Sequence, residues 1–404
     1  MDIVITNAHW NNRGDEAAHC ALWGELRRLY PGCEVTVLVK DRKSVEQFPD
    51  IDGFSAQVGQ FKVSPWKTWL AVLSRGLICS DAVLKSSIQV LKRADLIIYP
   101  PGGAVICDRF FWSKQVEYLL PFMCAKVFGI AMAVCSPSMG PFESSPSRPT
   151  RKWLLQTPKA FCVREDISRR YLESIGIQHD VVVTMDLAFM DDPDPNKESA
   201  ELEKYTELKE FLDSHEKVVG VTISDFKWHV KLGKDKELSS RIDSSFRAFI
   251  AWLTGQGIGV LLIPQLFGNQ NDIDDLNQHL VPGVFVMDEN KDTYFQQYVI
   301  SQLHSVIGMR YHSNIFAAKV GTPFIAIPYE EKMQGFLELA GLTDHMLTLD
   351  QVSVESLQEK FSAISNNQER IRATLRNQRE DWRARAMKTV DTLKSAIGQS
   401  DSAS

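Results

Sequence analysis

The sequence predicts an α/β protein with two Rossmann-like, doubly wound domains and a helical C-terminal extension. Short apolar strands alternate with longer helical patterns along most of the 404 residues, which is typical of parallel sheets covered by helices on both faces. A chain of this length favours two domains. The polar stretch DDPDPNKESAELEKY, with two prolines, separates two groups of strands. We therefore predict an N-terminal domain at residues 1–190, a linker at 191–215, a second domain at 216–350 and an extension at 351–404.

Each domain is justified by its own series of apolar runs. The first half has six that fit strands, at residues 2–6, 34–39, 95–99, 131–136, 160–163 and 181–185. The second half has five, at residues 217–223, 259–263, 283–286, 305–309 and 323–327. After residue 350 no strand pattern continues. A long stretch from about 367 to 397 places apolar residues at helical intervals and could close back over one domain.

Composition excludes several classes of protein. Hydrophobic content of 44% and charged content of 24% are ordinary for a folded globular chain. A net charge of −6 argues against general nucleic-acid binding, which requires a basic face. The seven cysteines are an odd number without CxxC spacing, so we expect reduced, packed thiols and no metal site. The N-terminus opens directly on a strand, and no signal peptide or membrane span is expected, which favours a cytoplasmic protein.

The most informative residues follow the strand at 305–309. We interpret Arg310 to Ser313 as a polar corner and Asn314 to Val320 as the first turns of a helix. Side chains two apart on an extended segment point the same way, so Arg310 and His312 would project together beside a helix N-terminus. Such a place favours a phosphate or carboxylate. Lys332, in the loop or first turn after the next strand, could reach the same pocket.

Polar and glycine residues also follow strands of the first half, at the sheet edge where doubly wound domains bind ligands. Asn12, Gly14 and Asp15 follow the first strand and lead into a helix, and Gly102 with Gly103 follows the third. Glycines there would let a ligand approach the backbone closely. A turn with an N-cap explains Asn12 to Asp15 nearly as well, and a tight connection explains Gly102 and Gly103 nearly as well.

Another candidate, Arg164, follows the strand at 160–163 and precedes Glu165 and Asp166. From the residues alone, a ligand-binding role and an internal ion pair at the start of the next helix both remain open. The acidic runs at 191–194 and 272–275 resemble metal-binding DxD patterns. However, the first lies in the predicted linker and the second at a predicted helix start, so solvated or capping roles are expected for both.

Together these motifs resemble the polysaccharide pyruvyl transferase family. The resemblance covers about residues 3–345 and is carried by NxGDE, GG, VRED, TMDLAF and MRYHSNIFAAKVGTPFIAIPYEEKMQGF. It implies a GT-B-like fold in which two Rossmann-like domains face a cleft. It also implies transfer of pyruvate from phosphoenolpyruvate to two hydroxyls of a sugar, giving a cyclic ketal. The expected role is exopolysaccharide biosynthesis in the cytoplasm, with a glycan or glycan precursor as acceptor and no further cofactor.

The resemblance also assigns residues. The family's donor-site arginine falls on Arg164, its RxH motif on Arg310 and His312, and its lysine on Lys332. Since an imidazole gives and takes protons near neutral pH, His312 is the predicted acid–base group. Asp15 is a candidate for activating the sugar hydroxyl. We expect the acceptor on the N-terminal domain and the donor on the C-terminal one. The remaining predicted substrate-binding residues are Asn12, Gly14, Gly102 and Gly103.

Two other functions remain open from the sequence. A GT-B-type glycosyltransferase using a nucleotide sugar is favoured by Glu330 and Glu338, which have the spacing of an acidic donor-site pair. A noncatalytic glycan-binding protein on the same fold is the third hypothesis. The sequence does not indicate an oligomeric state.

One helical region carries an additional interpretation. Residues 61–93 combine Trp66 and Trp69 with six basic residues. A helix of this kind usually packs on its own sheet, but a basic and aromatic face can also rest on an anionic membrane. Peripheral attachment at the inner face of the membrane is therefore a second possibility for localisation.

Overall fold

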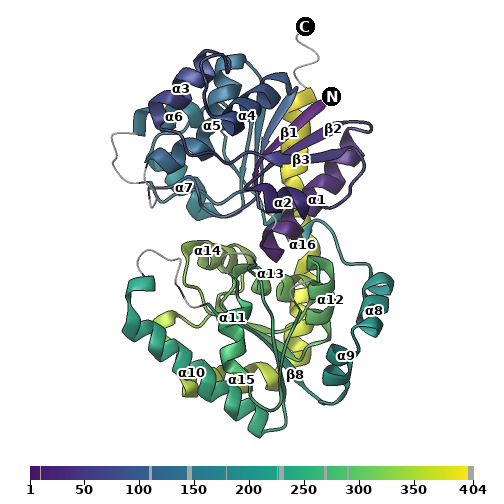
Figure 1. Cartoon of the computed structure of the whole chain (residues 1–404). Helices are drawn as coiled ribbons and strands as arrows, with labels where there is room; N and C mark the ends of the chain where they lie inside the picture. Colours follow the sequence, from purple (N-terminus) through teal and green to yellow (C-terminus); the bar gives the residue numbers. More distant parts are fainter. Residues whose placement is uncertain are drawn as a thin grey trace. The chain divides into compact units, whose positions relative to one another are not determined.

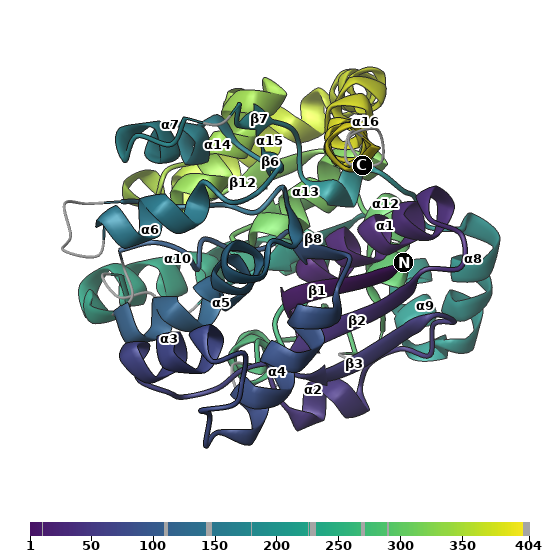
Figure 2. The ribbon, with the colours of Figure 1, turned by 90° about the horizontal axis from the view of Figure 1, so that it is seen from above.

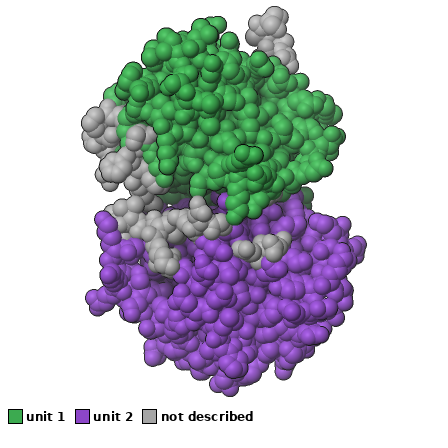
Figure 3. All heavy atoms as spheres, in the orientation of Figure 1, with its two compact units in different colours: residues 1–10, 18–190, 383–404 green, residues 11–17, 191–382 purple. Residues whose placement is uncertain are grey.

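A computed structural model describes residues 1–9, 11–108, 112–142, 148–178, 180–224, 226, 232–267, 271–288 and 291–398. The chain divides into two compact units, coloured separately in Figure 3. Unit 1 comprises residues 1–10, 18–190 and 383–404, and unit 2 comprises residues 11–17 and 191–382. Each unit has its own sheet and its own core.

Unit 1 contains a seven-stranded parallel sheet with strand order β3-β2-β1-β4-β5-β6-β7 (Figure 1). Its strands are β1 Asp2–Ala8, β2 Glu34–Val39, β3 Phe54–Val58, β4 Leu96–Tyr99, β5 Ala131–Cys135, β6 Ala160–Val163 and β7 Val182–Val183. Its helices are α1 Arg13–Leu29, α2 Arg42–Glu46, α3 Pro65–Leu73, α4 Ala82–Arg93, α5 Trp112–Phe128, α6 Arg148–Leu155 and α7 Asp166–Ser174. The central strands are buried apolar runs because helices cover both faces. Strand order reverses between β1 and β4, which makes this pair the topological switch point.

Unit 2 contains a five-stranded parallel sheet with order β10-β9-β8-β11-β12. Its strands are β8 Val218–Thr222, β9 Gly259–Leu262, β10 Val284–Val286, β11 Ser305–Gly308 and β12 Phe324–Ala326. Its helices of eight or more residues are α8 Pro195–Lys204, α9 Thr206–Asp213, α10 Lys236–Gly255, α12 Thr293–Gln302, α13 Tyr311–Val320, α14 Glu331–Ala340, α15 Val354–Asn366 and α16 Gln368–Gly398, which continues into unit 1. The short helix α11 spans Ile273–Leu276. Here the switch point lies between β8 and β11.

Two helices follow the strands at and beside this switch point. Nearly every residue of α13 is buried, which explains why its sequence lacks an amphipathic pattern. Both α13 and α14 end at a glycine in the left-handed region, Gly321 with φ 77° and Gly341 with φ 70°. A residue with a Cβ disfavours this conformation, so the two glycines fix where the helices stop.

The predicted fold class is confirmed, because both units are parallel sheets with helices on their faces and a helical region follows (Figure 2). All eleven expected strands are present, but β3 was missed because its short sequence FSAQV is only partly buried at the sheet edge. The stretch 191–215, expected as a linker, contains α8 and α9. In the extension, Leu375, Trp382 and Leu393 of α16 are buried. None of the described helices combines the length and apolarity needed to span a membrane.

Candidate functional site

The junction of β11 and α13 holds the two residues that the sequence emphasised. Arg310 has extended backbone at the N-cap position of α13, and the helix begins at Tyr311 rather than at Asn314. The predicted polar corner is therefore wrong: His312 lies in the first helical turn, so the extended-chain argument does not apply to it. The Arg310 backbone N–H donates to Thr222 Oγ1 (3.2 Å) at the end of β8. That bond fixes Arg310 at the switch point.

Arg310 is held by a carboxylate that the sequence analysis interpreted differently. Its guanidinium donates to Asp272, a buried residue that also accepts from the backbone N–H groups of Gln265 (2.9 Å) and Leu266 (3.1 Å). Burial opposes the charge of Arg310, but Asp272 and the Tyr329 hydroxyl outweigh it and raise the arginine's pKa. Asp272 occupies the N-cap position of α11, at the helix start that was expected, but its side chain does not cap this helix. The carboxylate is buried in a long-range ion pair with Arg310 instead, so the expected solvated role is wrong.

The first turn of α1 lies against the side chain of His312. Gly14 packs so closely on the imidazole that a Cβ added to it would lie 1.8 Å from His312 Cγ. Asn12 Oδ1 accepts from the N–H groups of Gly14 (2.9 Å) and Asp15 (3.3 Å), so it caps α1, which begins at Arg13. Asn12 also forms an antiparallel bridge with Leu266. Residues 11–17 therefore belong to unit 2, not to the N-terminal domain where they were expected.

Lys332 is in the first turn of α14 and lies near both other predicted site residues. Its Nζ is 5.6 Å from the centroid of the Tyr311 ring, and that ring lies edge-on to His312 with a centroid separation of 4.8 Å. The charge of Lys332 also acts on Tyr329, which interacts with Arg310, and opposes the burial that raises the pKa of this tyrosine. An ion pair of 2.6 Å joins Lys332 to Glu330. The structure thus brings Arg310, His312 and Lys332 together.

Backbone dipoles at this sheet edge favour an anion. The helices α13 and α14 begin at the carboxyl ends of the neighbouring strands β11 and β12. Within the described residues, neither N-cap residue, Arg310 or Glu330, caps its helix with its side chain. Free N–H groups and the positive end of the helix dipole attract phosphates and carboxylates.

Several buried polar atoms around the switch point have no hydrogen-bond partner among the described residues. Arg310 Nε, Asn314 Oδ1, Ser224 Oγ and Gln265 Oε1 form no hydrogen bond with any residue that the structure describes. They follow β11, β8 and β9, which are neighbours in the sheet. Each such atom costs about 1–3 kcal/mol when it stays unsatisfied, so this cluster is typical of a binding site for a polar ligand or ordered water.

Asn314 is fixed by two main-chain acceptors. Its Nδ2 donates to the carbonyls of Gly308 and Arg310, both at 3.0 Å. A Cβ at Gly308 would lie 2.2 Å from Asn314 Oδ1, so only glycine leaves room for the amide. The sequence analysis did not select Asn314, although its position four residues after Arg310 on a helix was a usable signal.

Glu16 is a second residue that the sequence analysis missed. It is 5% exposed and accepts from Arg13 (2.6 Å). Burial raises the pKa of Glu16 to about 7, although Arg13 opposes this shift and Asp292 adds to it. A carboxyl whose pKa burial raises toward neutrality is more frequent at functional sites than elsewhere. Asp15, the predicted base, is its half-buried neighbour.

Arg164 has a different environment in unit 1. It is 2% exposed and donates to Asp186 (2.7 Å) and Ser138 (2.9 Å), and Glu165 lies 3.5 Å from its Nε. Burial raises the pKa of Glu165, although Arg164 and Ser168 favour the ionised form. These contacts match the internal ion pair that the sequence left open, and they join the end of β6 to residues that follow β5 and β7.

The glycines after β4 lie at the switch point of unit 1. The Gly102 carbonyl accepts from Ser138 N (3.0 Å), and Gly103 accepts from Val105 N (2.8 Å). A Cβ built at Gly102 would meet none of the described atoms within 4 Å. The space that a side chain at position 102 would occupy is therefore open among the described residues.

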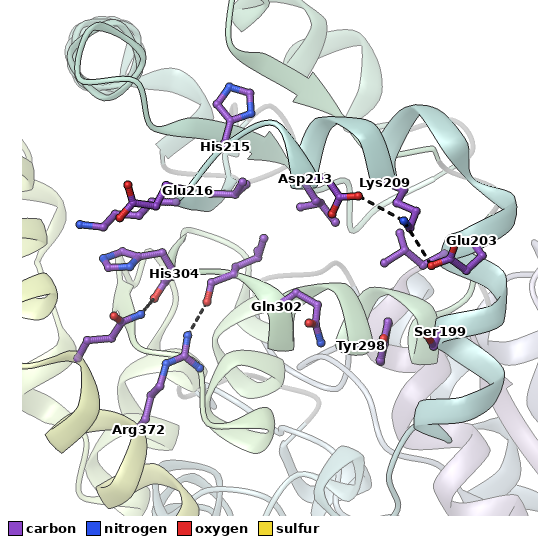
Figure 4. Close-up of a pocket in the computed structure, with 16 residues that line it drawn as sticks. Ser199, Glu203, Lys209, Asp213, His215, Glu216, Tyr298, Gln302, His304 and Arg372 are labelled. Atoms are coloured by element: carbon purple, nitrogen blue, oxygen red, sulfur yellow. Dashed lines mark hydrogen bonds and ion pairs between the residues drawn. The ribbon is translucent and has the colours of Figure 1, made fainter.

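A cavity of about 560 Å³ lies at the amino ends of the unit 2 strands, beside the first residues of β8 and β11 (Figure 4). Two of its cations, Lys209 and Arg372, already have partners. Lys209 contacts Asp213 (3.3 Å) and Glu203 (3.5 Å), and Arg372 donates to the Leu303 carbonyl (2.6 Å). Since doubly wound sheets bind ligands at the carboxyl ends of strands, we assign the functional site to the β8–β11 switch point and not to this cavity.

The acidic pair behind the glycosyltransferase hypothesis does not form one site. Glu330 is at the N-cap of α14 and pairs with Lys332, whereas the exposed Glu338 accepts from Gln334 (2.8 Å). Eight residues of helix separate them by about 12 Å. No group of metal ligands is present among the residues described here.

Comparison with known families identifies the family of this chain. The family model for polysaccharide pyruvyl transferases matches residues 12–331, which contain Arg310 and His312 and end one residue before Lys332. The chain belongs to the polysaccharide pyruvyl transferase family. A member of this family is expected to act as a transferase in polysaccharide pyruvylation.

A curated relative and two solved structures extend the comparison. The amylovoran biosynthesis protein AmsJ of Erwinia amylovora is 24% identical over 330 residues, covering 77% of this chain and 75% of AmsJ. The UDP-GlcNAc 2-epimerase of Neisseria meningitidis matches with a TM-score of 0.61 and 13% identity over 98% of this chain and all of that one. The α,α-trehalose 6-phosphate synthase of Burkholderia multivorans matches with a TM-score of 0.58 and 11% identity over 99% of both chains. These two likenesses support the GT-B-like fold of this family member.

Proposed function

We propose that the chain transfers the pyruvyl group of phosphoenolpyruvate to two hydroxyls of a sugar in a glycan or glycan precursor. The products would be a cyclic ketal and phosphate. The observation that carries this proposal is the group at the β8–β11 switch point: Arg310, two helix N-termini, and buried polar atoms that have no hydrogen bond among the described residues. Membership of the pyruvyl transferase family supports the same chemistry.

The donor carries a carboxylate and a phosphate on a small frame, so it needs several cationic donors close together. Asp272 orients the Arg310 guanidinium without using its Nε–H, which remains available for an anion. Lys332 is 23% exposed in its ion pair with Glu330, so the donor phosphate can replace the glutamate there. Charge-assisted hydrogen bonds contribute about 1.5–3 kcal/mol each, which is enough for a small anion to bind at two or three such contacts.

Ketal formation requires a positioned proton donor. Protonation of the methylene carbon C3 makes C2 electrophilic, one sugar hydroxyl adds to C2, and the bond from C2 to the phosphate oxygen breaks. A second hydroxyl then closes the ketal. Of the two hydroxyl protons, one returns to the acid and the other leaves with phosphate. His312, held between Gly14 and Tyr311, is the residue that we propose for the proton transfers.

The acceptor is proposed to bind at the switch point of unit 1. Gly102 and Gly103 lie there, and the space above Gly102 is open to a ligand within the described part of the chain. Asp15 remains the candidate that activates a sugar hydroxyl. Asn12 and Gly14 instead serve the donor side, since Asn12 caps α1 and Gly14 seats the imidazole.

The test is to incubate the purified protein with phosphoenolpyruvate and a panel of glycosides. We expect phosphate release that depends on the acceptor, with the mass of the added pyruvyl group on the sugar by mass spectrometry. Lys332→Met should raise the KM for phosphoenolpyruvate about tenfold with a smaller change in kcat, since it removes one donor contact. Lys209→Met, in α9 beside the cavity of Figure 4, is the matched control. Turnover of nucleotide sugars without phosphoenolpyruvate consumption, or no turnover of any glycoside, would contradict the proposal.

A further inference from the structure

Unit 1 exposes a group of large apolar side chains on one segment. Within the described residues, Trp66 is 64% exposed, Leu73 62%, Leu77 86% and Ile78 59%, and Leu70 is also exposed. These five account for most of the large exposed hydrophobic side chains and lie within thirteen consecutive positions. Apolar residues scattered singly over a surface need no explanation, but a contiguous patch marks an interaction site.

Helix α3 is apolar on both of its faces. Thr68, Ala71 and Val72 point inward and are buried, where α3 packs against α4 and α5 (Figures 1 and 2). On the other side, Trp66 and Leu70 are one turn apart and Leu73 follows three residues later, so they form one stripe. A helix with apolar residues on both faces is normally covered on both.

The exposed stripe continues onto α6. Trp153 is 44% exposed, and its ring centroid is 6.0 Å from that of Trp69 on α3. The Nζ of Lys126, on α5, lies 5.3 Å from the centroid of the Trp153 ring. The patch therefore spans α3, the turn that follows it and α6, and Lys126 of α5 places a cation at its edge.

The segment that carries most of the patch is rich in basic residues. Residues 61–93 contain six basic residues and a single acidic one, although the whole chain has a net charge of −6. The acidic residue, Asp81, accepts from Leu84 N (2.8 Å) as the N-cap of α4. Lys67 Nζ lies 5.5 Å from the centroid of the Trp66 ring. The patch thus differs in sign from the protein as a whole.

Helix α4 adds two exposed lysines to the same side. Gln89 donates to the carbonyl of Arg75 (3.0 Å), which places this face of α4 against the turn between Leu73 and Leu77. Lys85 and Lys92 are four residues before and three residues after Gln89, so they share its face. Both are exposed.

We propose that the patch formed by Trp66, Leu70, Leu73, Leu77, Ile78 and Trp153 docks on an anionic lipid bilayer. Tryptophan and leucine on one face with lysine and arginine around it suit the boundary between headgroups and acyl chains. The lysines around the patch complement negatively charged headgroups. A second copy of the chain fits less well, because a symmetric contact would bring two basic rims together. This inference is independent of the proposed pyruvyl transfer.

The experiment is vesicle flotation with the whole chain, using phosphatidylcholine alone and phosphatidylcholine mixed with phosphatidylglycerol. We expect binding to the anionic vesicles that weakens as salt increases. The double variant Leu77→Ser and Ile78→Ser should bind these vesicles at least about tenfold more weakly, because it removes two of the most exposed apolar groups. Lys67→Gln with Lys85→Gln should weaken binding to anionic vesicles only.

The matched control is Leu280→Ser with Val281→Ser, which removes two exposed apolar residues of unit 2 (49% and 43%). It should bind vesicles like the unaltered chain. No vesicle binding, or equal binding by the Leu77 and Ile78 variant, would overturn the proposal. So would self-association that this variant abolishes in the absence of lipid. All of these variants should release phosphate normally with a water-soluble acceptor, so failure of the proposed chemistry is detected separately.

Discussion

Arg164 in unit 1 and Arg310 in unit 2 each follow a short buried strand and precede a helix. Arg164 follows β6, two strands away from the switch strand β4, and meets Asp186 and Glu165. Arg310 follows β11 at the switch point itself and meets one carboxylate, Asp272. The first arginine is surrounded by carboxylates that neutralise it, whereas the second retains an unsatisfied Nε among the described residues.

The comparison links the partners of an arginine to the place of its strand in the sheet. At a switch point the loops from two neighbouring strands diverge and leave space for a ligand. Farther along the sheet, adjacent connections pack together and a buried guanidinium requires internal partners. Variants at the two places should therefore differ: those at Arg164 should lose stability, and those at the β8–β11 switch point should lose activity.

The largest expected effect comes from Arg164→Met. It would leave Asp186 and Glu165 buried without their cation, which costs about 3–5 kcal/mol. Chemical denaturation should show this loss, while the KM for phosphoenolpyruvate of the folded protein stays unchanged. Arg169→Met, which removes a partly exposed arginine paired with Asp166, should cost less than about 1 kcal/mol. A large rise in the KM for phosphoenolpyruvate of the Arg164 variant would instead indicate that Arg164 binds the donor.

Glu16→Gln tests the titrating carboxyl of unit 2. The pKa of Glu16 is raised by burial from 4.5 to about 7, so the folded state binds more protons than the unfolded state between these values. The free energy of unfolding should therefore fall as the pH rises through this window. The glutamine variant lacks this fall, and the stability difference between the two proteins should change by up to about 3 kcal/mol between pH 4.5 and 8. A difference that does not vary with pH would contradict the shift.

Most of the fold could be predicted from the sequence, but the site could be predicted only in part. The buried runs of β4, β6 and β11 are visible as apolar segments, and Arg310, His312 and Lys332 share a motif and come together. Asp272 could not be paired with Arg310, because 38 residues separate them and local patterns do not report such contacts. For the same reason, the sequence could not show that Gly14 packs on His312 or that residues 11–17 belong to unit 2.

His312→Ala should lower turnover about a hundredfold or more, the scale expected for an acid–base group. Binding of phosphoenolpyruvate should persist, because Arg310 and Lys332 remain. The measurement is kcat at saturating donor, with calorimetric binding of phosphoenolpyruvate in parallel. His304→Ala is the matched control, since His304 is also buried but precedes β11 at the other edge of the sheet and bonds to Ser365 (2.9 Å). Equal kcat values for the His312 variant and the unaltered chain would remove the imidazole from the mechanism.

A smaller effect is expected from Gly14→Ala, which keeps the imidazole but displaces it. The added Cβ would lie 1.8 Å from His312 Cγ, so the imidazole ring must move. Turnover should therefore fall by about tenfold to a hundredfold, and at most by as much as removal of the acid–base group itself. Gly24→Ala is the matched control in the same helix, because a Cβ there meets none of the described atoms within 4 Å. Alanine is the better helix former, so that variant should be slightly more stable and fully active. Combining Gly14→Ala with His312→Ala should cost no more than His312→Ala alone. Additive losses would mean that Gly14 acts by some route other than seating the imidazole.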